Sequence, residues 1–141
     1  MAYIPQTLRR QVAACAQDCC EYCHTCAKVN GGPLVIDHIQ PESKGGTTIL
    51  ENLALACSRC NTHKAALTHY LDPFTCQQVT LFNPRLQNWS EHFRWDDTYT
   101  KIIGVTPHGR ATILALNMND PAIIVARTVW ASGGWHPPHH L

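Results

Sequence analysis

The sequence has no long apolar run. Its longest uninterrupted apolar stretches, such as residues 122–126, are far shorter than the roughly 20 residues that a helix needs to cross a bilayer. The first residues contain no apolar segment typical of a secretory signal. We therefore expect a soluble, cytoplasmic protein without a membrane partner.

An excess of charge of either sign is also lacking. Charged residues make up 15% of the chain and the formal net charge is +1, so the overall electrostatics do not predict a nucleic-acid binder. Any affinity for DNA must come from a local basic face, and the alternative is the mixed-charge surface of any soluble domain. The candidates for such a face are Arg9, Arg10, Lys44, Arg59 and Lys64.

Internal repeats and low-complexity segments are absent as well. With 45% hydrophobic residues the composition is that of a globular protein, and 141 residues suffice for one domain with little room for a second. We expect a single domain over residues 1–141, with a core at about 18–70 and a C-terminal extension at about 71–141.

Cysteine, by contrast, is abundant, with eight residues. Without a secretory signal, paired C-x-x-C motifs predict metal binding rather than disulfides. Cys57 and Cys60 form one pair, and the other is either Cys20 with Cys23 or the overlapping Cys23 with Cys26. Four thiolates fill the shell of a tetrahedral zinc ion and leave no position for water, so such a zinc should be structural.

Periodicity and turn residues predict a mixture of helices and short strands. Helices are expected over residues 6–18, 61–70 and 121–131, the last with Asp120 as N-cap and Pro121 at its first position. Strands are expected over 34–39 and 78–82, with a hairpin of 92–95 and 99–105. Residues 41–48 are expected to be a loop, and 51–56 a short connector.

Residues 37–61 hold the most informative pattern, in the order Asp37-His38-Ile39, Pro41, Gly45-Gly46, Asn52-Leu53 and Cys57-Ser58-Arg59-Cys60-Asn61. This block resembles the HNH endonucleases of the treble-clef, ββα-metal (His-Me finger) kind, and the string Cys20-Glu21-Tyr22-Cys23 matches the first zinc knuckle of that family. Later motifs, from residues 71–73 to the closing helix, resemble the tail of small stand-alone bacterial HNH proteins. The resemblance thus covers nearly the whole chain.

The resemblance implies a fold of the α+β class. A ββα-metal core would be clamped by a structural zinc on four thiolates, and an N-terminal helix and a C-terminal β-hairpin with helices would surround it. The four zinc ligands would be Cys20, Cys23, Cys57 and Cys60. The other cysteines, Cys15, Cys19, Cys26 and Cys76, would then be ordinary thiols.

The resemblance also implies an activity, that of a metal-dependent endonuclease or nickase acting on double-stranded DNA. His38 would be the general base, since an ordinary histidine pKa of about 6.5 leaves it neutral in the cell. Asp37 and Asn61 would hold one magnesium or manganese ion, because both ions prefer oxygen ligands. Asn52 would pin the loop that orients His38.

The chain departs from the family pattern directly after the second cysteine pair, where Asn61 replaces the usual histidine. His63 lies two residues further on, about 200° around a helix, and should face away. Lys64, one turn after Asn61, should share its face and meet a phosphate. Together with Arg59 and Lys44, it is expected to contact nucleic acid.

Each of these residues also has a plain structural interpretation. Asp37 can be a charge on a hairpin, His38 a half-buried ring with a backbone partner, and Asn52 or Asn61 a helix cap. The alternative function is a non-catalytic, zinc-stabilised module that binds nucleic acid, and a third is a zinc-stabilised protein-interaction domain.

Two groups of side chains outside the block have open interpretations. The aromatic residues Phe82, Trp89, Phe93 and Trp95 are predicted to pack in the core rather than to stack on bases. The histidines of the segment 136–140 either chelate a metal or belong to a disordered end.

Overall fold

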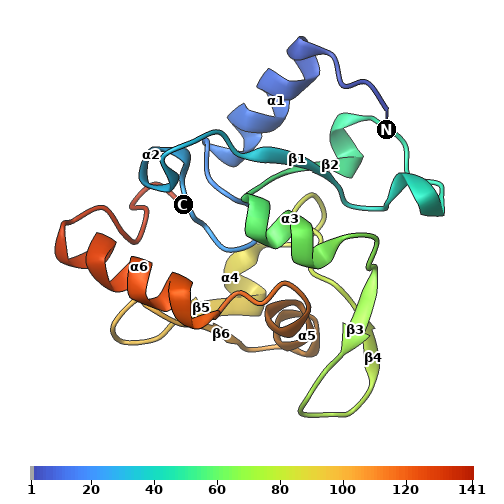
Figure 1. The fold of residues 1–141 in the computed structure, drawn as a ribbon. Coiled ribbons are helices and arrows are strands. Elements are labelled where there is room, and N and C mark those ends of the chain that lie inside the picture. Colours follow the sequence, from blue (N-terminus) through green and yellow to red (C-terminus); the bar gives the residue numbers. More distant parts are fainter. Residues whose placement is uncertain (1) are drawn as a thin grey trace.

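In the part of the chain that the structure describes, each strand pairs with a neighbour in sequence, which gives three separate two-stranded antiparallel sheets. The computed structural model describes residues 2–141. Its strands are β1 (Val35–His38) with β2 (Leu53–Ala56), β3 (His69–Leu71) with β4 (Gln78–Thr80), and β5 (Phe93–Trp95) with β6 (Ile102–Gly104). The expected α+β class is confirmed. The helix α1 lies along the β1–β2 hairpin, whereas the β3–β4 hairpin projects from the molecule (Figure 1).

Helices make up most of the remaining regular structure. They are α1 (Gln6–Ala16), α2 (Ala27–Asn30), α3 (Ser58–Lys64), α4 (Trp89–His92), α5 (Pro107–Ala115) and α6 (Pro121–Ser132). Two single turns of 3₁₀ helix, Glu42–Lys44 and Leu50–Asn52, lie in the long connection from β1 to β2. The helix α3 begins two residues after β2 and packs against β1, so β1, β2 and α3 form one unit (Figure 1).

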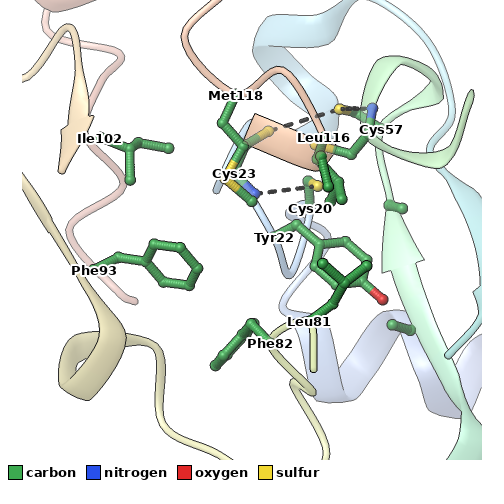
Figure 2. Close-up of a cluster of buried hydrophobic side chains, with 14 residues drawn as sticks. Cys20, Tyr22, Cys23, Cys57, Leu81, Phe82, Phe93, Ile102, Leu116 and Met118 are labelled. Atoms are coloured by element: carbon green, nitrogen blue, oxygen red, sulfur yellow. Dashed lines mark hydrogen bonds between the residues drawn. The ribbon is translucent and has the colours of Figure 1, made fainter. Parts of the chain in front are cut away.

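The β1–β2 hairpin lies between two hydrophobic clusters. All four residues of β2 are buried, because α1 packs on the hairpin and the cysteine-rich cluster lies against it. The larger cluster joins the buried cysteines to aromatic and aliphatic side chains of the C-terminal half (Figure 2). Phe82 and Phe93 are buried in it and Trp89 and Trp95 pack against it, which confirms their predicted packing role.

Local signals located several elements correctly. The hairpin predicted in the C-terminal half is β5 with β6, and α6 begins at Pro121 with the Asp120 carboxylate accepting a hydrogen bond from the Ala122 amide at 2.9 Å. The C-terminal segment was expected to chelate a metal or to be disordered. The structure corrects the second interpretation for His136, which is buried and lies 2.8 Å from the Tyr99 carbonyl oxygen.

Two predicted elements were wrong. The helix predicted over residues 61–70 is the shorter and earlier α3, which ends at Lys64 because Ala65 adopts a positive φ of 46° and the chain turns into β3. The segment 51–56 is not only a connector, since its second part is the buried strand β2. No helix within residues 2–141 is long and apolar enough to cross a membrane.

Candidate metal centre and the polar site around His38

Four cysteine sulfurs converge at the start of α3. Cys20 and Cys23 precede the β1–β2 hairpin, Cys57 and Cys60 follow it, and their Sγ atoms all lie within 4.8 Å of one another. The Sγ atoms of Cys23 and Cys57 are 3.7 Å apart. Two thiolates at about 2.3 Å from a tetrahedral zinc ion are separated by about 3.8 Å, so the spacing fits zinc.

The backbone at each cysteine pair supports this arrangement. The Cys23 amide approaches the Cys20 sulfur at 3.5 Å, and the Cys60 amide approaches the Cys57 sulfur at 3.4 Å. Cys57 is therefore also the N-cap of α3. All four side chains are buried, and four soft donors at this spacing form a cluster that can hold zinc.

Arg59 lies at this cluster instead of on a free basic surface. Its Nη2 atom is 3.5 Å from the Cys23 sulfur. Burial would lower the pKa of Arg59, but the negative charge of the surrounding thiolates raises it above its usual range. Arg59 is partly exposed, so its contact with nucleic acid stays a prediction.

Two cysteines that were expected to be free thiols are bonded to each other. Cys19 and Cys26 form a disulfide, whereas Cys15 and Cys76 are free and exposed. The disulfide also excludes the alternative pairing of Cys23 with Cys26 as the first knuckle in this state of the protein. The sequence could not distinguish these possibilities, because both motifs have the same spacing.

The first cysteine pair is linked to the rest of the molecule by the two residues inside it. Tyr22 is fully buried, and its hydroxyl donates to Asp37 Oδ2 at 2.7 Å. Burial and the nearby Asp37 carboxylate raise the pKa of Tyr22, so the hydroxyl stays protonated. Glu21 accepts two hydrogen bonds from Arg85, at 2.6 and 2.7 Å, and one from the Leu55 amide at 2.8 Å.

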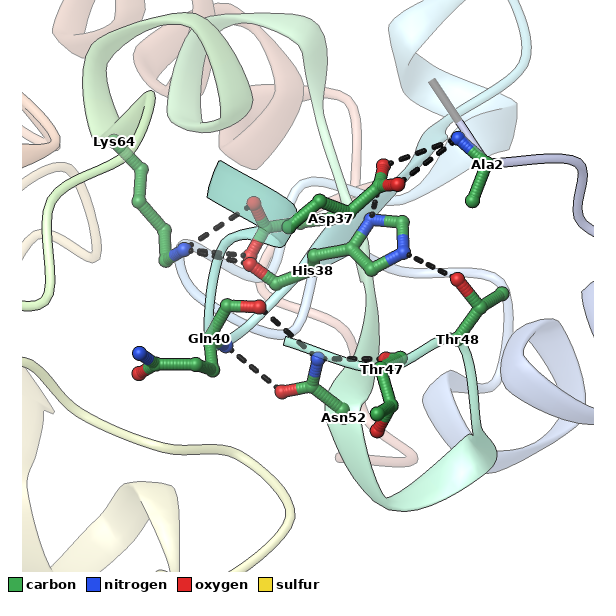
Figure 3. A network of polar contacts seen from close by, with 9 residues as sticks. Ala2, Asp37, His38, Gln40, Thr47, Thr48, Asn52 and Lys64 are labelled. Atoms are coloured by element: carbon green, nitrogen blue, oxygen red, sulfur yellow. Dashed lines mark hydrogen bonds and ion pairs between the residues drawn. The ribbon is translucent and has the colours of Figure 1, made fainter. Parts of the chain in front are cut away.

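Asp37 is buried and paired with Lys64. The Lys64 Nζ atom lies 3.1 Å from Asp37 Oδ2 and donates to the carbonyl oxygens of His38 and Ile39, each at 3.0 Å (Figure 3). Burial raises the pKa of Asp37, and the ammonium of Lys64 and the hydroxyl of Tyr22 oppose that rise. Lys64 is only 1% exposed, so the prediction that it meets a phosphate is corrected.

His38 stands at the end of β1 with a polar partner at each ring nitrogen. Its Nε2 atom is 3.0 Å from Thr48 Oγ1, and its Nδ1 atom is 3.7 Å from Glu42 Oε1 (Figure 3). The side chain is 12% exposed. A carboxylate beside Nδ1 favours the tautomer that carries its proton there, which leaves the Nε2 lone pair to accept a proton.

Asn52 holds together the two ends of the loop that follows β1. Its Oδ1 atom accepts from the Gln40 amide at 2.8 Å, and its Nδ2 group donates to the carbonyl oxygens of Gln40 and Thr47 at 3.0 and 2.8 Å (Figure 3). Glu42 and Thr48, the partners of His38, both lie in this loop or next to it. Asn52 thus fixes the loop from which the ring of His38 receives its contacts.

The adjacent glycines serve this loop in different ways. Gly45 has a φ of 86° and ends the first 3₁₀ turn. Gly46 lies against the backbone, since a Cβ atom added there would be 1.7 Å from the Gln40 carbonyl oxygen and 3.0 Å from Asn52 Nδ2. Any larger residue at position 46 must therefore displace the loop.

Replacing Gly46 with alanine is expected to lower the free energy of unfolding by about 1–3 kcal/mol, the usual cost of overpacking. The measurement is chemical denaturation of the zinc-loaded protein. The matched control is Gly32→Ala, because a Cβ atom there meets nothing within 4 Å and φ is not positive. Equal midpoints for the two variants would contradict the close approach at Gly46.

The remaining predicted residues lie at the edge of this site. Asn61 is on α3, three residues before Lys64, so the two share the helix face that packs on β1. Its side chain makes no hydrogen bond within residues 2–141 and is partly exposed. Lys44 is exposed in the loop after β1, and His63 is exposed with Nδ1 2.9 Å from the Arg59 carbonyl oxygen.

Comparison with known families adds one finding to this geometry. Residues 20–66 match the model of the HNH endonuclease family. This segment is similar to HNH endonucleases. The matched segment begins at the first zinc-type cysteine and ends just after α3, so it contains both cysteine pairs, the β1–β2 hairpin and His38. No curated protein matches the sequence significantly.

The match of residues 20–66 to HNH endonucleases suggests a nuclease-type or nucleic-acid-related function. Sequence reasoning missed several residues that complete the site, namely Glu21, Tyr22, Glu42 and Thr48. Position inside the C-x-x-C motif was the only available signal for Tyr22. Glu42 and Thr48 carried no signal of their own, because loop composition does not reveal which side chains reach a given ring.

Proposed function

We propose that the protein is a metal-dependent endonuclease or nickase that hydrolyses phosphodiester bonds in DNA. The observation that carries the proposal is the setting of His38, whose ring is held between Glu42 and Thr48 and which directly follows the buried Asp37 in β1. A module that only binds nucleic acid has no need for an imidazole oriented in this way. The match of this segment to the HNH family supports the same function.

In this proposal His38 is the general base. With its proton on Nδ1 toward Glu42, the ring accepts a proton from the attacking water at Nε2, where the Thr48 hydroxyl now lies. The carboxylate of Glu42 then stabilises the imidazolium that forms. Asn52 acts as a positioning residue, because it holds the loop that carries these contacts.

Asp37 and Asn61 are the proposed ligands of a magnesium or manganese ion. The Asp37 carboxylate on β1 and the Asn61 side-chain amide on α3 supply the hard oxygen donors that these ions prefer. When bound, the ion would neutralise charge on the scissile phosphate. The ammonium of Lys64 already lies beside Asp37, so we infer that Lys64 competes with the ion for the Asp37 carboxylate.

The same proposal assigns a structural zinc to Cys20, Cys23, Cys57 and Cys60, and a ββα-metal core to β1, β2 and α3. Lys44 is the proposed phosphate contact, because it is exposed in the loop that holds the partners of His38. Double-stranded DNA is the proposed substrate. The partly exposed Arg59 is a second proposed contact. Lys64 is not part of this contact surface, since its ammonium is buried and bound inside the protein.

Incubation of the purified protein with supercoiled plasmid tests the proposal. Conversion to open-circle or linear DNA is expected in magnesium or manganese and not in EDTA, and the product form distinguishes a nick from a double-strand cut. Because EDTA can also remove zinc, a parallel sample is kept with zinc but without magnesium or manganese. Equal conversion in that sample would contradict the ion assignment.

The pairing of Asp37 with Lys64 favours a second candidate, a zinc-stabilised module that binds nucleic acid without cutting it. In that case the ammonium permanently takes the place of the divalent ion. Retention of the plasmid DNA in a gel shift, with no conversion of supercoiled plasmid in magnesium or manganese, would support this function over the nuclease. A Lys44→Ala variant should weaken DNA binding in both cases and so serves as a check on the surface.

A further inference from the structure

A second group of metal-type ligands lies beside the zinc-type cysteines. Cys19 and Cys26 face each other across an isolated antiparallel bridge, which is closed by hydrogen bonds from the Ala27 amide to the Asp18 carbonyl at 2.9 Å and from the Cys20 amide to the Thr25 carbonyl at 2.8 Å. Both side chains are buried. The backbone, and not only the disulfide, therefore keeps the two sulfurs together.

The C-terminal segment brings a histidine to this pair. His140 Nε2 lies 3.6 Å from the Cys19 sulfur, and the ligand atoms of Cys19, Cys26 and His140 all lie within 4.8 Å of one another. A sulfur at about 2.3 Å and a nitrogen at about 2.0 Å from one tetrahedral zinc ion are separated by about 3.5 Å. The histidine thus stands where a ligand of the same ion would stand.

We propose that Cys19, Cys26 and His140 form a second metal site in the reduced protein, for zinc or another thiophilic divalent ion. The site is separate from the cluster at Cys20, Cys23, Cys57 and Cys60. The proposal does not depend on the proposed nuclease activity. It gives a role to His140, which the site around His38 leaves unused. It also ties the end of the chain to the loop of the first cysteine pair.

Metal binding requires reduction of the disulfide. A dithiol reductant attacks one of the two sulfurs, the Cys19–Cys26 bond breaks, and a second exchange releases the reductant as its own disulfide. Two electrons and two protons pass to the cysteines, which become thiols. Binding of the ion then releases both thiol protons, because cysteine coordinates as a thiolate. The same pair of residues is thus a disulfide when oxidised and a ligand pair when reduced.

Three protein ligands leave one position of a tetrahedral ion open. Cys19 and His140 both line a cavity of about 680 Å³, together with Trp89 and Trp95. Water or a small anionic or thiol ligand can reach the open position from there. This differs from the four-cysteine cluster, in which the protein itself fills every position.

Zinc stoichiometry of the full-length protein tests the proposal. The protein is loaded with zinc under a phosphine reductant, exchanged into metal-free buffer, and its zinc content is measured by mass spectrometry. Wild type is expected to hold two ions per chain when reduced and one when prepared without reductant. His140→Ala should hold one ion when reduced. The matched control, His139→Ala, removes the neighbouring histidine and should hold two.

The difference between variants, rather than the total, decides the result. Equal zinc content in reduced wild type and reduced His140→Ala would overturn the second site. If the four-cysteine cluster itself took no zinc, wild type would still exceed His140→Ala by one ion. Cobalt substitution supplies an independent readout, because the second ion should add a weaker sulfur-to-metal charge-transfer band, from two thiolates instead of four, that is absent in His140→Ala.

Discussion

Cys57→Ser is expected to unfold the protein rather than merely to lower its activity. Cys57 belongs to the buried cluster and also caps α3, so its loss removes one zinc ligand and the N-terminal support of that helix. Structural zinc contributes about 10–16 kcal/mol in small zinc domains, which equals or exceeds the total stability of most domains, about 5–15 kcal/mol. We expect loss of the cooperative thermal transition together with loss of one zinc ion.

The control for this variant is Cys15→Ser, which removes an exposed free thiol outside both cysteine groups. It should melt as wild type does and keep its zinc. Circular dichroism and zinc analysis of the two variants give the comparison. A Cys57→Ser protein that melts as wild type does would show that the four sulfurs do not stabilise the fold through a metal.

The consequences of zinc loss should reach beyond the cluster. Tyr22 and Glu21 lie between the two cysteines of the first pair, and they hold Asp37 on one side and Arg85 with β2 on the other. The zinc-type cluster therefore positions the polar site and joins the two halves of the chain. The first C-x-x-C motif therefore has a second role besides zinc binding, because the residues inside it hold the polar site and β2 in place.

Features determined by adjacent residues could be predicted from the sequence. The two C-x-x-C pairs, the start of α6 at Asp120 and Pro121, and the hairpin of β5 and β6 all rest on spacing, capping or alternation within a short segment. The loop after β1 followed from its glycines and proline. In each case the residues that carry the signal are those that form the structure.

Features that depend on distant partners could not be predicted. Lys64 has the spacing of a surface phosphate contact, but Asp37 and two carbonyl oxygens draw its ammonium into the interior. Arg59 likewise faces thiolates from a segment 36 residues earlier in the chain. Periodicity gives the face of a helix on which a side chain lies, but it does not reveal which charged groups lie on the element that packs against that face.

The second large effect is expected at His38. In the proposed mechanism, His38→Ala removes the base that accepts the proton of the attacking water, and a positioned general base contributes about 10²–10⁴ in rate. We expect plasmid conversion to fall by that factor at constant magnesium. Zinc content and melting temperature should change little, because the ring is at the edge of the loop and its partners, Glu42 and Thr48, reach solvent.

The matched control is His63→Ala, which removes an exposed histidine on α3 whose side chain, within residues 2–141, has a hydrogen-bond partner only in the Arg59 carbonyl. It should cleave at the wild-type rate. Measuring both variants beside wild type separates loss of the base from general loss of positive charge or of folding. Wild-type cleavage by His38→Ala would remove the base assignment. Cleavage lost equally in both variants would point instead to α3, because that helix connects the cysteine cluster to Asp37 through Lys64.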